Sequence, residues 1–178
     1  MTANRNTPYY FTVIAVFILL KFAYTLADNT DLYFLLKPTD KIIEIITNSN
    51  SICVNDGGYF HDKLNVVIDK SCSGFNFWIL CFIMLAFAVI KFLQDRNRKI
   101  AALPITLLAA YIFTIFANTS RILFSVFIHR SGAKLADGHI SWLHQAEGTF
   151  IYLFFLIIFY LGVNFTLTEL TRHNAKLT

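Results

Sequence analysis

The sequence predicts an all-α membrane protein with four transmembrane helices and a small extracytoplasmic segment. Of its 178 residues, 56% are hydrophobic and 19 are Phe, and the mean hydropathy of +0.57 is too apolar for a soluble domain of this length. Four apolar runs are long enough to cross a hydrocarbon core, which takes about 20 helical residues. The basic residues cluster beside these runs and form no stripe with interleaved aromatics, so the net charge of +4 indicates membrane topology and excludes a nucleic-acid partner.

We expect the spans to cover residues 9–27, 75–92, 101–127 and 150–167. The first run is longer than the apolar core of a signal peptide, so it predicts a retained helix in which Lys21 reaches the nearer surface. No repeat, low-complexity tract or linker divides the chain. The sequence therefore predicts one integral membrane domain over residues 1–178.

The basic residues also predict the orientation of the chain. Residues 91–99, between the second and third spans, carry four basic residues and one acid, which is typical of a cytoplasmic loop. Arg5, Arg172 and Lys176 then lie on the same side, so both termini are expected in the cytoplasm. Residues 28–70 and 128–149 are expected to face outward.

The outer segment, residues 28–70, has two expected parts. Residues 32–46 mix Leu and Ile with charged residues and Pro38, which predicts a partly helical stretch lying on the membrane surface. Residues 52–54 and 65–68, apolar except for Asn65, flank a turn with Gly57 and Gly58, which predicts a small β-hairpin ending just before Cys72.

The three cysteines, Cys53, Cys72 and Cys81, show no CxxC pairing and no zinc spacing, so we expect no disulfide framework and no structural metal. Cys72 lies a few residues before the second span, at the N-terminus of the predicted helix, where unpaired backbone N–H groups and the helix dipole favour a thiolate. Cys81 lies inside that span and is expected to be a small buried hydrophobe. Cys53 is either a strand residue or a disulfide partner of Cys72, and such a disulfide would abolish the nucleophile.

Arg121 interrupts the third apolar run. At about 1.5 Å per residue from Ala101 it lies roughly 30 Å along the helix, at the outer interface and level with Cys72. An arginine there marks a functional site or reaches to lipid headgroups. Asn118 and Ser125 share its helical face, which favours the first reading, in which the guanidinium stabilises an oxyanion.

His144 precedes the outer end of the fourth span and titrates in a range that suits proton transfer to a leaving amine. His61, His129 and His139 are expected on the same side of the membrane. His173 is expected on the cytoplasmic side. The residues alone give His144 a modest preference.

Three blocks of the sequence, taken in order, resemble the signature blocks of the exosortase/archaeosortase family, over about residues 70–150. These blocks are Ser71-Cys72-Ser73-Gly74, the run from Asn118 to Ile122, and His144 with Gly148 and Phe150. The resemblance implies a membrane cysteine transpeptidase in which Cys72 is the nucleophile, Arg121 the essential arginine and His144 the histidine. The short chain is similar to the exosortase K subgroup, which implies a Gram-negative inner membrane with the active site on the periplasmic side.

The expected partners are exported proteins with a C-terminal sorting signal, membrane lipids, and an amine acceptor or water. No cofactor is expected. Polar side chains near the site are expected to help position the substrate: Asn118, Ser120 and Glu147. Two alternatives stay open, a metal-dependent intramembrane hydrolase and a non-enzymatic scaffold in which Arg121 binds lipid and Cys72 only packs. The first would use Asp137, His139, His144 and Glu147.

Overall fold

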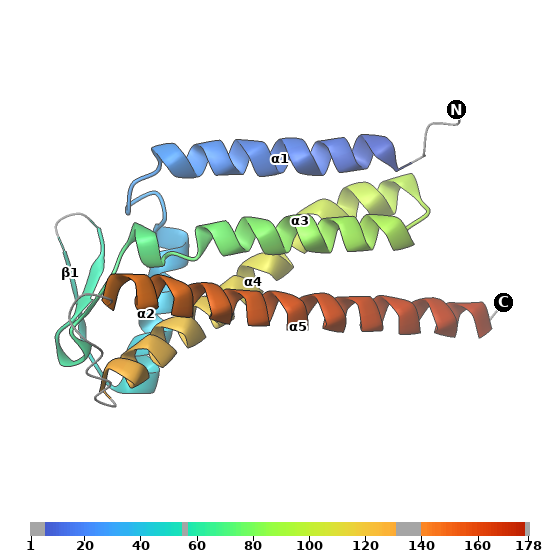
Figure 1. The fold of residues 1–178 in the computed structure, drawn as a ribbon. Helices are drawn as coiled ribbons and strands as arrows, with labels where there is room; N and C mark the ends of the chain where they lie inside the picture. The colour runs from blue at the N-terminus through green and yellow to red at the C-terminus, as the bar shows by residue number, and fades with distance from the viewer. Residues whose placement is uncertain (1–5, 55–56, 131–139, 177–178) are drawn as a thin grey trace. The chain divides into compact units, whose positions relative to one another are not determined.

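A computed structural model describes residues 6–54, 57–130 and 140–176 (Figure 1). Within this part of the chain, four helices are long and apolar enough to cross a membrane, which confirms the predicted all-α membrane fold. They are α1 (Thr7–Leu26), α3 (Phe75–Phe92), α4 (Arg96–Arg130) and α5 (Ile140–Lys176).

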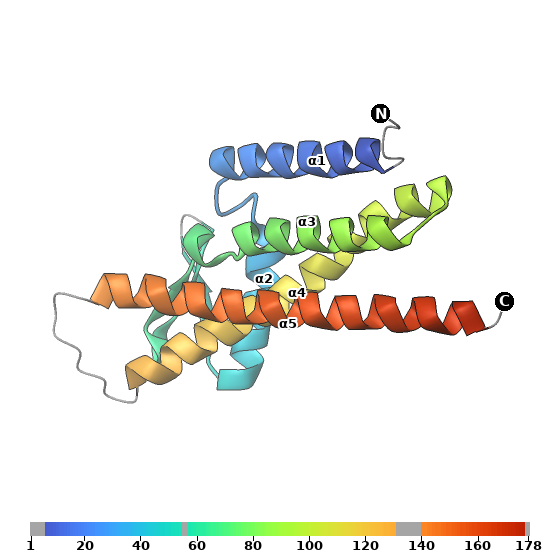
Figure 2. The ribbon, with the colours of Figure 1, turned by 45° about the vertical axis from the view of Figure 1, so that its right-hand side comes forward.

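Helices α4 and α5 are longer than the spans expected from hydropathy (Figure 2). Apolar runs locate the part of a helix that fits the hydrocarbon core, whereas Arg, Lys and Glu are good helix formers and continue it beyond that core. The basic stretch 91–99 is therefore mostly helical, with only residues 93–95 between α3 and α4.

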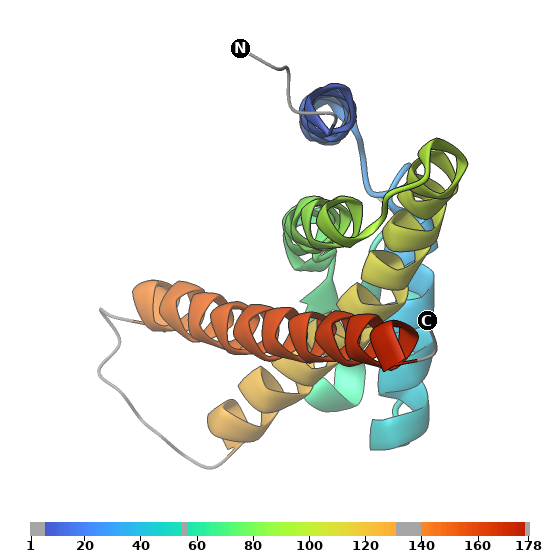
Figure 3. The same cartoon turned by 90° about the vertical axis from the view of Figure 1, so that its right-hand side faces the viewer.

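The chain forms two compact units. In the first unit α1 packs beside α3, and both are seen nearly end-on in Figure 3. Tyr10 and Phe87 meet edge to face with ring centroids 5.0 Å apart. Lys21, an expensive charge in an apolar helix, donates a hydrogen bond to Asn76 Oδ1 at 2.6 Å. This unit comprises Met1–Thr25, Asn76–Phe113 and Leu156–Thr178.

The second unit comprises Leu26–Phe75 and Thr114–Phe155. It contains helix α2 (Tyr33–Thr47) and a three-stranded antiparallel sheet in the order β1-β2-β3. The strands are β1 (Ser51–Cys53), β2 (Tyr59–His61) and β3 (Val66–Ile68), and two 3-10 turns, η1 (Asp62–Leu64) and η2 (Lys70–Cys72), precede and follow β3.

The predicted β-hairpin is present, but its second strand differs from the expected one. Val54 N–H donates to Gly58 O at 2.8 Å and Gly57 N–H donates to Val54 O at 2.9 Å, with Gly57 at a φ of 77° that suits glycine. The partner of β1 is β2, and residues 66–68 follow as the third strand. Asn55 and Asp56 of the expected turn lie outside the described residues.

The prediction of a helix in residues 32–46 is confirmed by α2, whose apolar face carries the buried residues Leu35, Leu36 and Ile43. The same face carries Asp40, whose Oδ1 lies 3.0 Å from His61 Nε2, and neither side chain is exposed to solvent. The other ring nitrogen of His61 lies 2.9 Å from Ser49 Oγ. Asp40 and His61 Nε2 meet at ion-pair distance, without a hydrogen bond among the described residues, and this buried polar contact joins α2 to β2.

A second polar contact joins α2 to β1. Glu44 Oε1 accepts hydrogen bonds from the N–H and the hydroxyl of Ser51, both at 2.9 Å. Lys41, which pairs with Glu44, and these two donors lower the pKa of the Glu44 carboxyl to about 2. The carboxylate thus covers the outer edge of β1.

Candidate active site

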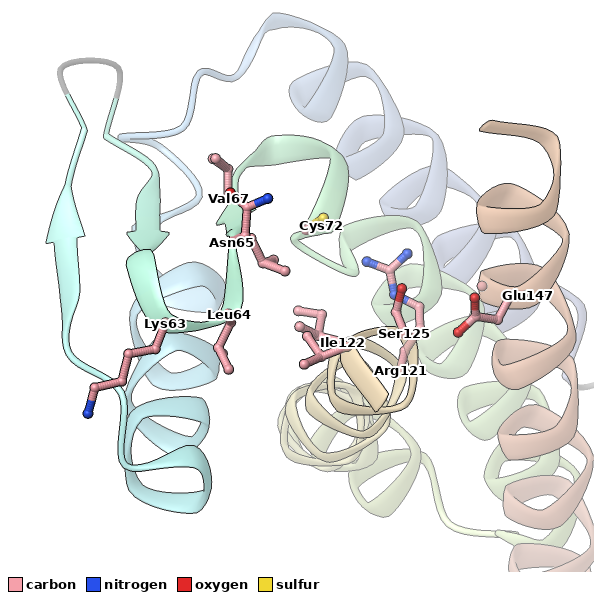
Figure 4. Close-up of a pocket in the computed structure, with 12 residues that line it drawn as sticks. Lys63, Leu64, Asn65, Val67, Cys72, Arg121, Ile122, Ser125 and Glu147 are labelled. Atoms are coloured by element: carbon pink, nitrogen blue, oxygen red, sulfur yellow. The ribbon is translucent and has the colours of Figure 1, made fainter. Parts of the chain in front are cut away.

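A cavity of about 600 Å³ lies within the second unit, and both Cys72 and Arg121 line it (Figure 4). One wall is the backbone and side chains of residues 63–67, which lead into β3. Helix α4 contributes Arg121, Ile122, Ser125 and Val126, and α5 contributes Glu147 and Gly148. Residues far apart in the sequence therefore meet around one cavity.

Cys72 lies in the turn η2, which Asp69 closes. The Asp69 carboxylate accepts from the N–H of Ser71 at 2.9 Å and from its hydroxyl at 2.6 Å. Helix α3 begins only at Phe75, after Gly74 with a φ of 71°. Cys72 therefore lies just before the first turn of the helix, as the expected span of residues 75–92 implies, and the turn contacts hold it in place.

Asn118 connects the turn of Cys72 to both long helices of this unit. Its Nδ2 donates to Cys72 O and its Oδ1 accepts from the hydroxyl of Tyr152, both at 2.6 Å. The Asn118 side chain is completely buried. A Cβ at position 74 would lie 3.1 Å from Asn118 Cγ, so Gly74 is required both for its φ and for this close approach.

Arg121 contacts α5 at the aromatic ring of Tyr152 and at Gly148, which has no side chain. Its guanidinium carbon lies 5.2 Å from the centroid of the Tyr152 ring, within cation–π range. A Cβ at Gly148 would lie 3.2 Å from Arg121 Nη1. In Figure 4 the guanidinium points toward the turn that carries Cys72. Its Nε is buried and has no hydrogen-bond partner among the described residues, so the cation can bind an anion that forms in the cavity.

The other polar residues expected at the site differ in their position. Glu147 lines the cavity, and its Oε1 is buried without a hydrogen-bond partner in the described part of the chain. Ser120 is not among the cavity-lining residues, and its hydroxyl donates to Phe116 O at 2.9 Å, one turn back in its own helix. Glu147 is thus the residue that fits the predicted positioning role by location.

Of the candidate histidines, only the side chain of His61 is described, and it is buried against Asp40 outside the cavity lining. The backbone of His144 belongs to α5, but its side chain lies outside the described residues. The side chain of His129, and residues Asp137 and His139 altogether, also lie outside them. The role of His144 stays a prediction.

Sequence reasoning missed the part that Tyr152 plays. It lies four residues after Gly148, so helical spacing places both on one face, and this was the available signal. The three cysteines are free: Cys53 is exposed, Cys72 is half-buried and Cys81 is buried as expected. No disulfide therefore blocks the Cys72 thiol.

Comparison with known families gives one finding. The family described as transmembrane exosortase (Exosortase_EpsH) matches residues 9–161, most of the chain, and the match includes Cys72, Arg121 and His144. No curated protein and no solved structure matches the chain.

Proposed function

The chain belongs to the transmembrane exosortase family, and we propose that it is a cysteine transpeptidase that cleaves the C-terminal sorting signals of exported proteins. The family has a membrane transpeptidase role in protein sorting. The observation that carries the proposal is that Cys72 and Arg121, a nucleophile and a fixed cation, line one cavity. The likeness to the exosortase K subgroup remains a prediction from the short chain.

In the proposed reaction, His144 takes the thiol proton of Cys72 and Sγ attacks the scissile carbonyl carbon. A C–S bond forms, and the carbonyl oxygen becomes an oxyanion that the Arg121 guanidinium stabilises. The C–N bond then breaks, His144 gives its proton to the departing amine, and a thioester on Cys72 remains. An amine acceptor completes transpeptidation, or water completes hydrolysis, and each releases the Cys72 sulfur and a proton.

We further propose that both termini are cytoplasmic and that the cavity opens on the periplasmic side of the inner membrane. Four basic residues at positions 91–99 support this orientation. A substrate anchored by its own C-terminal helix would present the segment just outside that helix to the cavity. Fusion of topology reporters after position 94 and at the C-terminus tests the orientation, and a periplasmic signal from either refutes it.

The test of function is co-expression with a reporter, defined as an exported domain followed by an extended segment, a transmembrane helix and a basic tail, with the last three taken from candidate exported substrates. Processing should be lost in Cys72→Ala and kept in Cys53→Ala, since Cys53 is exposed and lies outside the cavity lining. Mass spectrometry should find the acyl adduct on Cys72, released by hydroxylamine.

Two outcomes contradict the proposal. Processing that survives Cys72→Ala and stops with a chelator indicates a metal-dependent hydrolase. Normal cellular function of a Cys72→Ala, Arg121→Ala double variant indicates a non-enzymatic scaffold.

A further inference from the structure

The two outer edges of the small sheet differ in what they face. The edge of β1 is covered, because the N–H of Ser51 donates to the Glu44 carboxylate at 2.9 Å. The edge of β3 borders the cavity, since Asn65, Val66 and Val67 line it together with Cys72 and Arg121 (Figure 4). The edge of β1 is thus bonded within the protein at Ser51, whereas the edge of β3 is open to the candidate active site.

The register shows which backbone groups lie on the open edge. The bond from Val54 N–H to Gly58 O turns the polar groups of Gly58 toward β1. Because these groups alternate in direction along an antiparallel strand, those of Tyr59 and His61 face β3, opposite Ile68 and Val66.

Val67, between the two paired positions, therefore directs its N–H and C=O away from β2. The same alternation holds in β1. The N–H of Ser51 points away from β2 and bonds to Glu44, and the next residue, Ile52, is the one paired with Phe60 of β2. Val67 is also 47% exposed. Among the described residues neither of these Val67 groups has a hydrogen-bond partner, so a peptide in the cavity can reach a donor and an acceptor of the backbone.

We propose that the extended segment of the substrate binds as an added strand along the free edge of β3. This rests on the proposed function and specifies how its substrate is held. Strand addition fixes an extended chain by main-chain hydrogen bonds and leaves alternate side chains to be read by pockets. Only residues 69–71 separate the end of β3 from Cys72, so a peptide on this edge continues directly past the nucleophile.

The test uses full-length protein in lipid nanodiscs with the reporter. Val67→Pro removes the outward N–H without removing a bond to β2, and proline is tolerated on an edge strand. We expect kcat/KM to fall about fivefold to tenfold, mainly through KM, as for the loss of one hydrogen bond. Cys53→Pro is the matched control, because it makes the same change on the edge of β1 away from the cavity, and it should process the reporter like the wild type.

Val67→Ala separates the backbone from the side chain, since it keeps the N–H, and it should lose clearly less kcat/KM than Val67→Pro. A loss in Val67→Ala equal to that in Val67→Pro overturns strand addition in favour of a side-chain contact. Processing that depends on Cys72 but is unchanged in Val67→Pro overturns only this inference. Processing that does not depend on Cys72 overturns the proposed function.

A measurement that keeps the strand intact covers the case in which Val67→Pro fails to accumulate. A Val67→Cys variant in a Cys53→Ala, Cys72→Ala background binds the reporter without cleaving it. Single cysteines are placed along the extended segment and oxidised. Strand pairing predicts disulfides at every second position, and uniform or absent cross-linking overturns it.

Discussion

The bridge at Asn118 allows the most direct test of how the candidate nucleophile is positioned. Asn118→Leu is close in size and removes both hydrogen bonds, leaving the Cys72 carbonyl and the Tyr152 hydroxyl without this partner. Each lost bond to a buried group costs about 1–3 kcal/mol, so we expect a total of about 3 kcal/mol. For a chain of this length that corresponds to a fall in Tm of about 6–12 °C.

Thermal unfolding in detergent, followed by a thiol-reactive dye, measures the stability, and reporter processing measures kcat and KM. Because Asn118 holds the backbone of Cys72, we expect kcat to fall by more than KM rises. Tyr152→Phe removes one bond and should cost about half as much in stability. Tyr160→Phe, which removes an exposed hydroxyl from the same helix, is the control. Wild-type stability and kcat in Asn118→Leu would refute the positioning role.

Three further predictions concern other contacts. Gly148→Ala places a methyl about 3.2 Å from the arginine guanidinium and should lower kcat, whereas Gly162→Ala, with nothing within 4 Å, should match the wild type; equal activities contradict this. Glu44→Gln should remove the acid-dependent loss of stability that the wild type shows as pH falls from 4.5 toward 2, because the folded pKa is lowered to about 2; parallel pH curves of Tm contradict this. His61→Phe leaves a buried carboxylate without its partner and should cost about 3 kcal/mol or more, and an unchanged Tm contradicts this.

The membrane spans could be predicted from the sequence because hydropathy measures the same property that places a helix in lipid. Counting helix rise predicted that Cys72 and Arg121 lie at the same depth, since an unbroken helix makes depth proportional to residue number. That both line one cavity depends on tertiary packing and came from the structure. The exact helix ends could not be predicted in this way, because charged residues extend a helix without signalling it in hydropathy.

The contacts of the second unit were less predictable. Strand β2 is three residues long and contains His61, so no period-two apolar pattern marks it. The pair of Asp40 and His61 joins residues 21 positions apart, and neither the helix pattern of the first nor the loop around the second indicates a partner. The role of Tyr152 was also not predictable, because its hydrogen bond to Asn118 depends on how α4 and α5 cross, and residue spacing within one helix does not encode that.

The bond pattern at Asn118 also restricts how the sequence can change. Asp lacks the donor that the Cys72 carbonyl needs, and Gln adds a methylene where even a Cβ at Gly74 would come within 3.1 Å. Neither close relative of asparagine can therefore replace it at position 118 without loss of a bond or a clash. A single amide thus ties the nucleophile turn, α4 and α5 together, so a change at this position alters all three at once.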